Sequence, residues 1–108
     1  VNQYKFVGKD NDTTGNALTV FATNKPGVNE TIIIKSIIIT SAGTPSVTVT
    51  NNSITAIKTA ALTANVSVEL LTQPLIVEGG SAFTIQSSTT DSFDFAVSFL
   101  NILKEKID

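Results

Sequence analysis

The stretch that decides the fold lies towards the end of the chain and reads Phe93-Asp94-Phe95-Ala96-Val97-Ser98-Phe99. Large apolar side chains occupy every second position of this stretch, with small or polar side chains between them. Successive side chains of a β-strand point to opposite faces, so a period of two places all three phenylalanines on one face. Burying each of them contributes roughly 1.5–3 kcal/mol to folding. The stretch therefore predicts a strand with one face in a hydrophobic core.

Segments of similar character precede this strand at regular intervals. Asparagine, glycine, proline and aspartate, which favour turns, separate short runs rich in β-branched or aromatic residues. The predicted strands cover residues 3–7, 17–23, 30–41, 46–50, 54–61, 67–70, 75–77 and 83–85, followed by the strand from Phe93. We expect a single all-β domain over residues 1–108, an antiparallel jelly-roll-like β-sandwich of about eight strands. Residues 103–108 are expected to form a flexible tail.

The longest predicted strand, residues 30–41, lacks simple alternation because it contains two triplets of isoleucine. Such a strand is either buried on both faces or bent near Lys35 and Ser36 as it crosses between two sheets. We expect it to lie in the interior, with partner contacts on loops or on an edge strand. A short helix is an alternative for residues 55–71, which contain three alanines, but the threonines and valines there favour strands.

Composition narrows the classes of function. The chain has 108 residues, a net charge of −2 and neither cysteine nor histidine, which removes disulfides, the commonest metal ligand and the usual general base. A slightly acidic chain lacks the basic face that nucleic acid binding requires. Its apolar runs are shorter than the roughly 20 residues of a membrane helix. We therefore expect neither nucleic acid nor membrane partners. Only 15% of residues are charged, so covering the surface desolvates few charges.

One loop resembles the start of a calcium site, namely Asp10-Asn11-Asp12-Thr13-Thr14-Gly15. Asp10, Asp12 and Thr14 offer oxygens at alternating positions, as calcium loops do. The glutamate that should close such a loop is replaced by Phe21, and no helix is predicted on either side. We interpret the stretch as a plain hairpin loop, and a cation bound in another geometry stays open.

Other groupings that could support catalysis lack a necessary part. Asp91 and Asp94 could act as paired carboxylates, but such pairs face each other across a cleft. We expect Asp91 to cap a turn and Asp94 to lie on the solvent face. Serine nucleophiles have no histidine to activate them, and no Ser-x-x-Lys spacing occurs. Gly79-Gly80 lacks the ending of a phosphate loop. The sequence therefore predicts no catalytic residue, no cofactor and no metal site, and hence no enzyme.

A series of stretches after residue 30 has a familiar order. The series is Ile34-Lys35-Ser36-Ile37-Ile38-Ile39-Thr40, Val47-Thr48-Val49-Thr50, Ser67-Val68-Glu69-Leu70-Leu71, Pro74-Leu75-Ile76-Val77, Glu78-Gly79-Gly80-Ser81 and Asp91-Ser92-Phe93-Asp94-Phe95-Ala96-Val97-Ser98-Phe99-Leu100-Asn101-Ile102. This order resembles a family of small β-sandwich virion proteins of tailed bacteriophages, frequent in marine and cyanobacterial phages. The chain departs from that family at Gly79-Gly80-Ser81, where Gly-Asp is usual. It departs again at Asn101, which replaces a glutamate, and in residues 104–108, which extend beyond the family pattern.

The resemblance implies a non-catalytic part of a virus particle. The expected role is capsid decoration or cement on the outer surface of the head. The expected partners are the major capsid protein or other virion proteins, and further copies of the chain in a homo-oligomer. Alternatives are a tail, neck or fibre component, or a carbohydrate-binding adhesion module. The last needs an exposed aromatic platform, and the chain has one tyrosine, Tyr4, and no tryptophan.

Overall fold

The computed structural model describes residues 2–21, 26–59 and 61–103. Within these residues the structure is all-β, and no helix is present that is long and apolar enough to cross a membrane. The helix considered for residues 55–71 is therefore wrong, since strands and turns occupy its described part. The strands are β1 (Asn2–Asp12), β2 (Leu18–Thr19), β3 (Glu30–Ser41), β4 (Val47–Asn51), β5 (Ile54–Lys58), β6 (Val68–Glu69), β7 (Leu75–Val77), β8 (Phe83–Ser87) and β9 (Phe93–Leu103).

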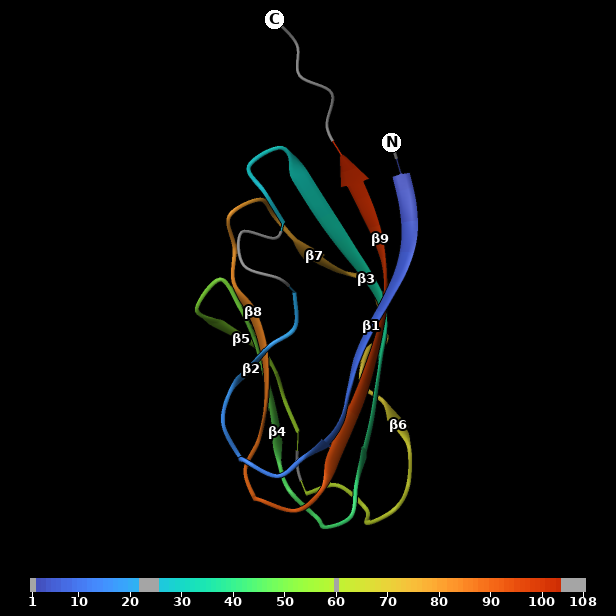
Figure 1. Ribbon diagram of the computed structural model, residues 1–108, viewed down its shortest axis with the longest axis vertical. Helices are drawn as coiled ribbons and strands as arrows, with labels where there is room; N and C mark the ends of the chain where they lie inside the picture. The colour runs from blue at the N-terminus through green and yellow to red at the C-terminus, as the bar shows by residue number, and fades with distance from the viewer. Residues whose placement is uncertain (1, 22–25, 60, 104–108) are drawn as a thin grey trace, which may run out of the picture.

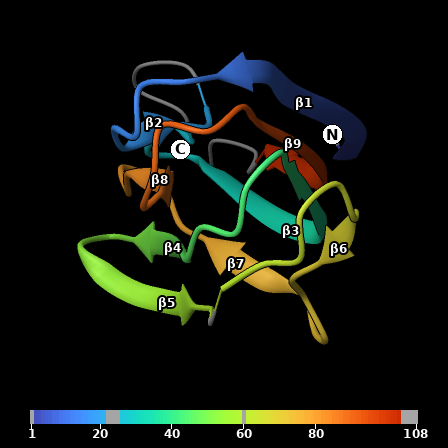
Figure 2. The same cartoon turned by 90° about the horizontal axis from the view of Figure 1, so that it is seen from below.

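The strands form two antiparallel sheets that face each other. The five-stranded sheet has the order β1-β9-β3-β6, with β7 also paired to β3, and the four-stranded sheet has the order β2-β8-β4-β5. In Figure 1, β1, β9 and β3 make the right-hand layer and β2, β8, β4 and β5 the left-hand layer. Figure 2 shows the same two layers from below. The predicted sandwich is confirmed.

The order of pairing shows that the sandwich is a jelly roll. From the chain ends inwards, β1 pairs with β9, β2 with β8, β3 with β6 and β7, and β4 with β5. Nested pairing of this kind results when one long antiparallel hairpin is rolled into two sheets. β6 and β7 lie along different parts of β3, opposite residues 38–39 and 32–34, so they share one position. The nine strands thus occupy eight positions, in agreement with the sandwich of about eight strands expected from the sequence.

The core consists of the inner faces of both sheets. Phe93, Phe95, Val97 and Phe99 are all buried, which confirms the register predicted for this strand. They meet the buried residues of β4 and β8, among them Val49 and Phe83. Phe21, which follows β2, joins the two layers, because its ring lies edge-on to Phe99 with 4.9 Å between ring centroids.

A β-bulge explains why the isoleucine triplets of β3 do not alternate as one series. The pairing of β3 with β9 shifts between Ile34 and Ser36, so Lys35 is the extra residue. Ile32 and Ile34 are buried before the shift, and Ile37 and Ile39 are buried after it. The middle residue of each triplet faces away from the core. The irregularity predicted at Lys35-Ser36 is present as a bulge, but the predicted crossing between sheets is wrong, because β3 stays a central strand of one sheet. Burial on both faces is wrong as well, since Ile38 is exposed.

Several predicted boundaries were wrong. β1 runs to Asp12 instead of ending at residue 7, β2 covers only Leu18–Thr19 in the described part of the strand predicted at 17–23, and β5 ends at Lys58. The stretch 10–15 is therefore only partly a loop. Leu103 belongs to β9 and not to a tail, whereas residues 104–108 lie outside the described residues, as do residues 22–25.

Candidate interaction surface

The outward face of the five-stranded sheet carries an apolar row across four strands. Tyr4 on β1 lies opposite Leu100 on β9. Leu100 lies opposite Ile33 on β3, and Ile33 lies opposite Ile76 on β7. The neighbours of these residues, such as Phe99 and Ile34, point into the core, so the four side chains point away from it. We refer to Tyr4, Leu100, Ile33 and Ile76 as the outer row.

Both ends of the outer row are open to solvent. The exposed fraction is 79% for Tyr4 and 53% for Ile76, while Leu100 and Ile33 between them are half-buried. Phe6, also on β1, adds a second aromatic side chain that is 69% exposed. Single exposed apolar side chains are ordinary, but a contiguous apolar patch on a sheet marks an interaction site.

The outer row lies in an uncharged part of the sheet. On one side of the row, the next outward-facing residues along the strands are Phe6, Ser98 and Ser36. On the other side, those with described side chains are Ile102 and Thr31. The charges closest to the row belong to Lys35, at the bulge, and to Glu78, which follows β7 and lines a surface pocket together with Ile76. Glu69 lies further along the face, and its carboxylate accepts the Ile37 backbone N–H at 2.7 Å. The row itself is therefore uncharged, and the charges around it are mostly acidic, since Asp94 on β9 also faces outward.

The edge of the sheet beside the outer row is also free. β1 ends the strand order, so in the described part of the chain only β9 pairs with it. Lys5 and Lys9 lie opposite Phe99 and Phe95, which places both lysines on the inner side of this edge. Charges at that position oppose the addition of another strand. The face is thus a better contact surface than the edge, although its two most exposed aromatic residues come from the edge strand.

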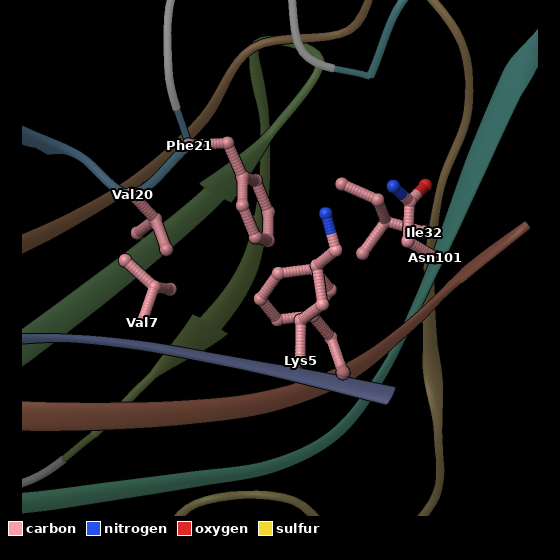
Figure 3. A pocket seen from close by; sticks show the side chains of 7 residues that line it. Lys5, Val7, Val20, Phe21, Ile32 and Asn101 are labelled. Atoms are coloured by element: carbon pink, nitrogen blue, oxygen red, sulfur yellow. The ribbon is translucent and has the colours of Figure 1, made fainter. Parts of the chain in front are cut away.

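A pocket opens between the two sheets near β1. Its volume is about 260 Å³, and its lining is mostly apolar. Figure 3 shows the Lys5 amine and the Asn101 amide directed towards its interior, beside Phe21 and Ile32. The buried Oδ1 of Asn101 accepts no hydrogen bond within the described residues. Pockets that hold ligands usually exceed about 300 Å³, so this one accommodates a small group at most.

The two aspartates considered for catalysis hold different segments of the chain. Asp94 Oδ1 accepts the backbone N–H of Asn11 at 2.6 Å. Asp91 Oδ2 accepts the Thr89 hydroxyl at 2.9 Å, within the turn before β9, so Asp91 has the predicted turn role. Their carboxylates are engaged with different partners, and this arrangement favours structural roles for both.

The calcium-like stretch divides between the strand and the loop. Asp12 is buried at the end of β1, and its Oδ1 accepts the Thr14 hydroxyl at 2.9 Å. Its Oδ2 is buried with no hydrogen-bond partner in the described part of the chain, and Asp10 is exposed. Residues 2–21, 26–59 and 61–103 contain no group of three or more acidic side chains that could hold a metal ion.

The glycine pair forms a tight turn between β7 and β8. The Ser81 N–H bonds to the Glu78 carbonyl at 3.1 Å, and the Gly80 N–H bonds to the Pro26 carbonyl at 2.8 Å. A Cβ on Gly79 would lie 2.4 Å from the carbonyl oxygen of Gly27. The pair allows a close approach of two backbones, which is a structural role.

The outer row was not among the residues that the sequence singled out. Tyr4 and Phe6 lie in the strand predicted at residues 3–7, but no exposed face was predicted for that strand. The sequence nevertheless indicates apolar residues on the outward face. Leu100 and Ile102 alternate with the core-facing residues of β9, and a strand with only one buried face would not need the middle isoleucine of each triplet in β3.

No protein-family model matches the chain, and no curated protein sequence matches it significantly. Solved structures resemble it in fold. One is from Bacillus endospore appendages, which form a family of disulfide-linked pili, with a TM-score of 0.54, 15% identity, and 97% of this chain and 88% of the other covered. Another, from a virus-like particle of the Macrobrachium rosenbergii extra small virus, has a TM-score of 0.47, 15% identity, and coverages of 98% and 81%. At this identity the pilus comparison establishes a shared fold and nothing further, and this chain has no cysteine with which to form a disulfide.

Proposed function

We propose that this chain is a non-catalytic structural protein of a tailed bacteriophage virion. Its expected place is the outer surface of the head, where it decorates or cements the capsid by binding the major capsid protein. The observation that carries the proposal is the outer row, an uncharged apolar face with Tyr4 79% exposed at its end. Such a face is typical of a protein that other subunits cover. The resemblance of residues 34–102 to phage virion proteins supplies the kind of assembly.

The proposed mechanism is passive. A protein that binds the assembled shell, but not the free capsid subunits, stabilises the shell by mass action. Each contact can be small, because many copies on one lattice act together. With only 15% of its residues charged, the chain desolvates few charges when it is covered.

The chemistry of the described residues is consistent with this role. The chain has no histidine and no cysteine, and the carboxylates of Asp91 and Asp94 accept hydrogen bonds from a turn and from β1, respectively. The two aspartates thus have separate structural partners.

The proposal is tested with phage heads that lack this protein. Purified chain is added to the heads, and binding is followed by co-sedimentation while the heat stability of the heads is recorded. We expect saturable binding and a higher disruption temperature, with isolated tails as the comparison. Failure to bind heads would contradict a decoration role, and binding to tails alone would place the protein there instead.

A second candidate is favoured by the exposed aromatic residues of β1. Tyr4 and Phe6 point outward on one face, and aromatic rings of this kind stack against sugars. The chain would then be a carbohydrate-binding adhesion module of a tail or fibre. Binding of the purified chain to a glycan array, with loss on Tyr4→Ala and Phe6→Ala, would support this candidate over decoration.

A further inference from the structure

We infer that the pocket between the two sheets binds an acylated apolar amino acid with a free carboxylate. This is the chemistry of the last residue of a polypeptide chain, and also that of a small N-acyl amino acid. The site lies inside the sandwich and not on the outer row, so the inference goes beyond the proposed function. Binding at this site does not depend on the virion role and is measured on the isolated chain.

The side-chain oxygen of Asn101 lacks a hydrogen-bond donor. Its Oδ1 is buried and accepts no hydrogen bond within the described residues. Asn101 lies opposite Ile32, which is 2% exposed, so both side chains are on the inner side of the sheet. A buried oxygen without a donor lowers stability, and native proteins leave few such groups. An N–H group of a ligand would satisfy this oxygen, which makes the pocket suited to a donor.

The amine of Lys5 supplies a positive charge to the same pocket. Lys5 lies opposite Phe99 and lines the pocket, and Figure 3 shows its amine directed towards the interior beside Phe21. A lysine amine forms a charge-assisted hydrogen bond with a carboxylate. The carboxylate of Glu30 does not line this pocket, and its Oε1 accepts the Gly27 backbone N–H at 3.4 Å. Because Lys5 is exposed, the carboxylate of the ligand stays at the mouth of the pocket, in contact with water.

The remaining walls of the pocket are apolar and held in place by other side chains. Phe21 packs against two rings, with its centroid 5.8 Å from that of Phe83 and 4.9 Å from that of Phe99. This part of the wall is therefore formed before a ligand arrives. The volume of about 260 Å³ is below that of pockets for drug-sized ligands. It suits one branched aliphatic side chain with the amide and carboxylate next to it. The apolar residues that line the pocket are Val7, Val20, Phe21, Ile32 and Phe99.

These features together select one class of ligand. A fatty acid has a carboxylate and an apolar body, but it has no N–H for Asn101. A free amino acid has an ammonium group, which would lie close to the amine of Lys5. An acylated amino acid carries its N–H, its carboxylate and its side chain on one carbon atom. The three groups therefore reach Asn101, Lys5 and the apolar wall at the same time, as in other sites that capture a C-terminal carboxylate.

The first test is a titration of the isotope-labelled chain with N-acetyl-leucine, followed by NMR. We expect saturable shifts of the Asn101 side-chain amide and of the backbone amides of Lys5 and Phe21. The expected dissociation constant is on the order of 0.1–1 mM, as for other ligands of this size. Absence of saturable shifts at these three residues would overturn the inference.

Three analogues of N-acetyl-leucine each remove one contact from the native chain. N-acetyl-leucinamide lacks the carboxylate for Lys5, isocaproate lacks the N–H for Asn101, and N-acetylglycine lacks the side chain for the apolar wall. Each should bind at least threefold more weakly than N-acetyl-leucine. Equal binding of all four compounds would overturn the inference, and this comparison needs no variant to fold.

A peptide that ends in leucine distinguishes the two sources of this chemistry. If the peptide binds at least as tightly as N-acetyl-leucine, and amidation of its end weakens it, the ligand is the end of a partner chain. If the peptide binds more weakly than N-acetyl-leucine, the ligand is a free acylated amino acid. Both results keep the assigned chemistry, whereas an amidated peptide that binds as well as the free acid would overturn it.

The last test uses variants of the two polar residues. Asn101→Leu should lower the affinity for N-acetyl-leucine roughly tenfold, while the unliganded chain melts at the same or a higher temperature. Lys5→Met keeps the aliphatic arm and should weaken N-acetyl-leucine a few-fold, because the ion pair is exposed to solvent, but leave N-acetyl-leucinamide unchanged. Lys9→Met is the matched control, since Lys9 is on the same side of β1, opposite Phe95, and does not line this pocket. Unchanged affinity in Asn101→Leu, or equal losses for Lys9→Met and Lys5→Met, would overturn the inference.

Discussion

The carboxylate of Glu69 accepts a hydrogen bond from the backbone N–H of Ile37 at 2.7 Å. Ser36, the residue before, donates its hydroxyl to the same carboxylate. These bonds lie next to the bulge of β3, where the strand would otherwise leave a backbone donor without a sheet partner. The bulge reverses the parity of β3, so that Ile33 and Ile38 both face outward. One glutamate on β6 thus supports the geometry that forms the outer face.

Removing this carboxylate should destabilise the domain. We expect Glu69→Ala to lower the free energy of unfolding by about 1–2 kcal/mol, because the Ile37 N–H loses a charged acceptor. Glu69→Gln keeps an acceptor oxygen and should cost less than half as much. Urea denaturation of the three proteins measures both effects. Equal losses for alanine and glutamine would show that the bond to Ile37 does not determine the stability of the bulge.

The glycine pair between β7 and β8 should respond to substitution in two different ways. A Cβ on Gly79 would overlap the backbone of Gly27 and Val28, whereas Gly80 has a φ of 80° and open space around it. Gly79→Ala and Gly79→Asn should each cost about 1–3 kcal/mol from overpacking. Gly80→Ala should cost about 1–2 kcal/mol, and Gly80→Asn clearly less, because asparagine tolerates the left-handed region.

The two glycines are compared by thermal melts of all four variants. The requirement at Gly79 would not be steric if Gly79→Asn melted at a higher temperature than Gly79→Ala. The requirement at Gly80 would not be conformational if Gly80→Asn melted no higher than Gly80→Ala.

Placing a charge on the inner face of β9 should abolish folding. Phe95 is buried among core residues, and Phe95→Asp both removes an aromatic side chain and buries an unpaired carboxylate. Losing the ring alone costs about 3–5 kcal/mol, which approaches the whole stability of a domain of this size. Ser98→Asp, on the exposed side of the same strand, is the control and should keep a cooperative melt. A folded Phe95→Asp protein would refute the assigned register.

Asp12 offers a test of the calcium-like stretch. Its Oδ2 is buried without a hydrogen-bond partner among the described residues, and an unpaired buried oxygen is costly. We expect Asp12→Asn to leave the stability unchanged or to raise it by up to about 1 kcal/mol, with no effect of calcium on the melting temperature of the native chain. A loss of stability in Asp12→Asn, together with a calcium-dependent rise in the native protein, would show that a cation completes this site.

The sequence predicts the fold well where one pattern determines it. The alternation from Phe93 to Phe99 is sufficient to assign the inner face of β9, and the gap at Lys35-Ser36 is sufficient to place the irregularity in β3. The strand boundaries could not be predicted in the same way. β1 continues to Asp12 because β9 provides backbone partners along most of its length, and this pairing joins the two ends of the chain.

The candidate surface was harder to predict because it depends on pairing between distant strands. Tyr4, Leu100, Ile33 and Ile76 are unremarkable separately, and only the register of β1, β9, β3 and β7 aligns them. The alternation within one strand shows that a side chain faces outward, but it does not show which residues of other strands lie beside it on the outward face. Asp91 was simpler, since its role lies within a short turn, whereas the partner of Asp94 is Asn11 on the distant strand β1.

The most direct test of the virion role is immunogold labelling of purified phage particles with an antibody to this chain. The account predicts label spread evenly over the heads, in many copies per particle. Absence of label from intact virions, with an antibody that recognises the folded chain in solution, would contradict it.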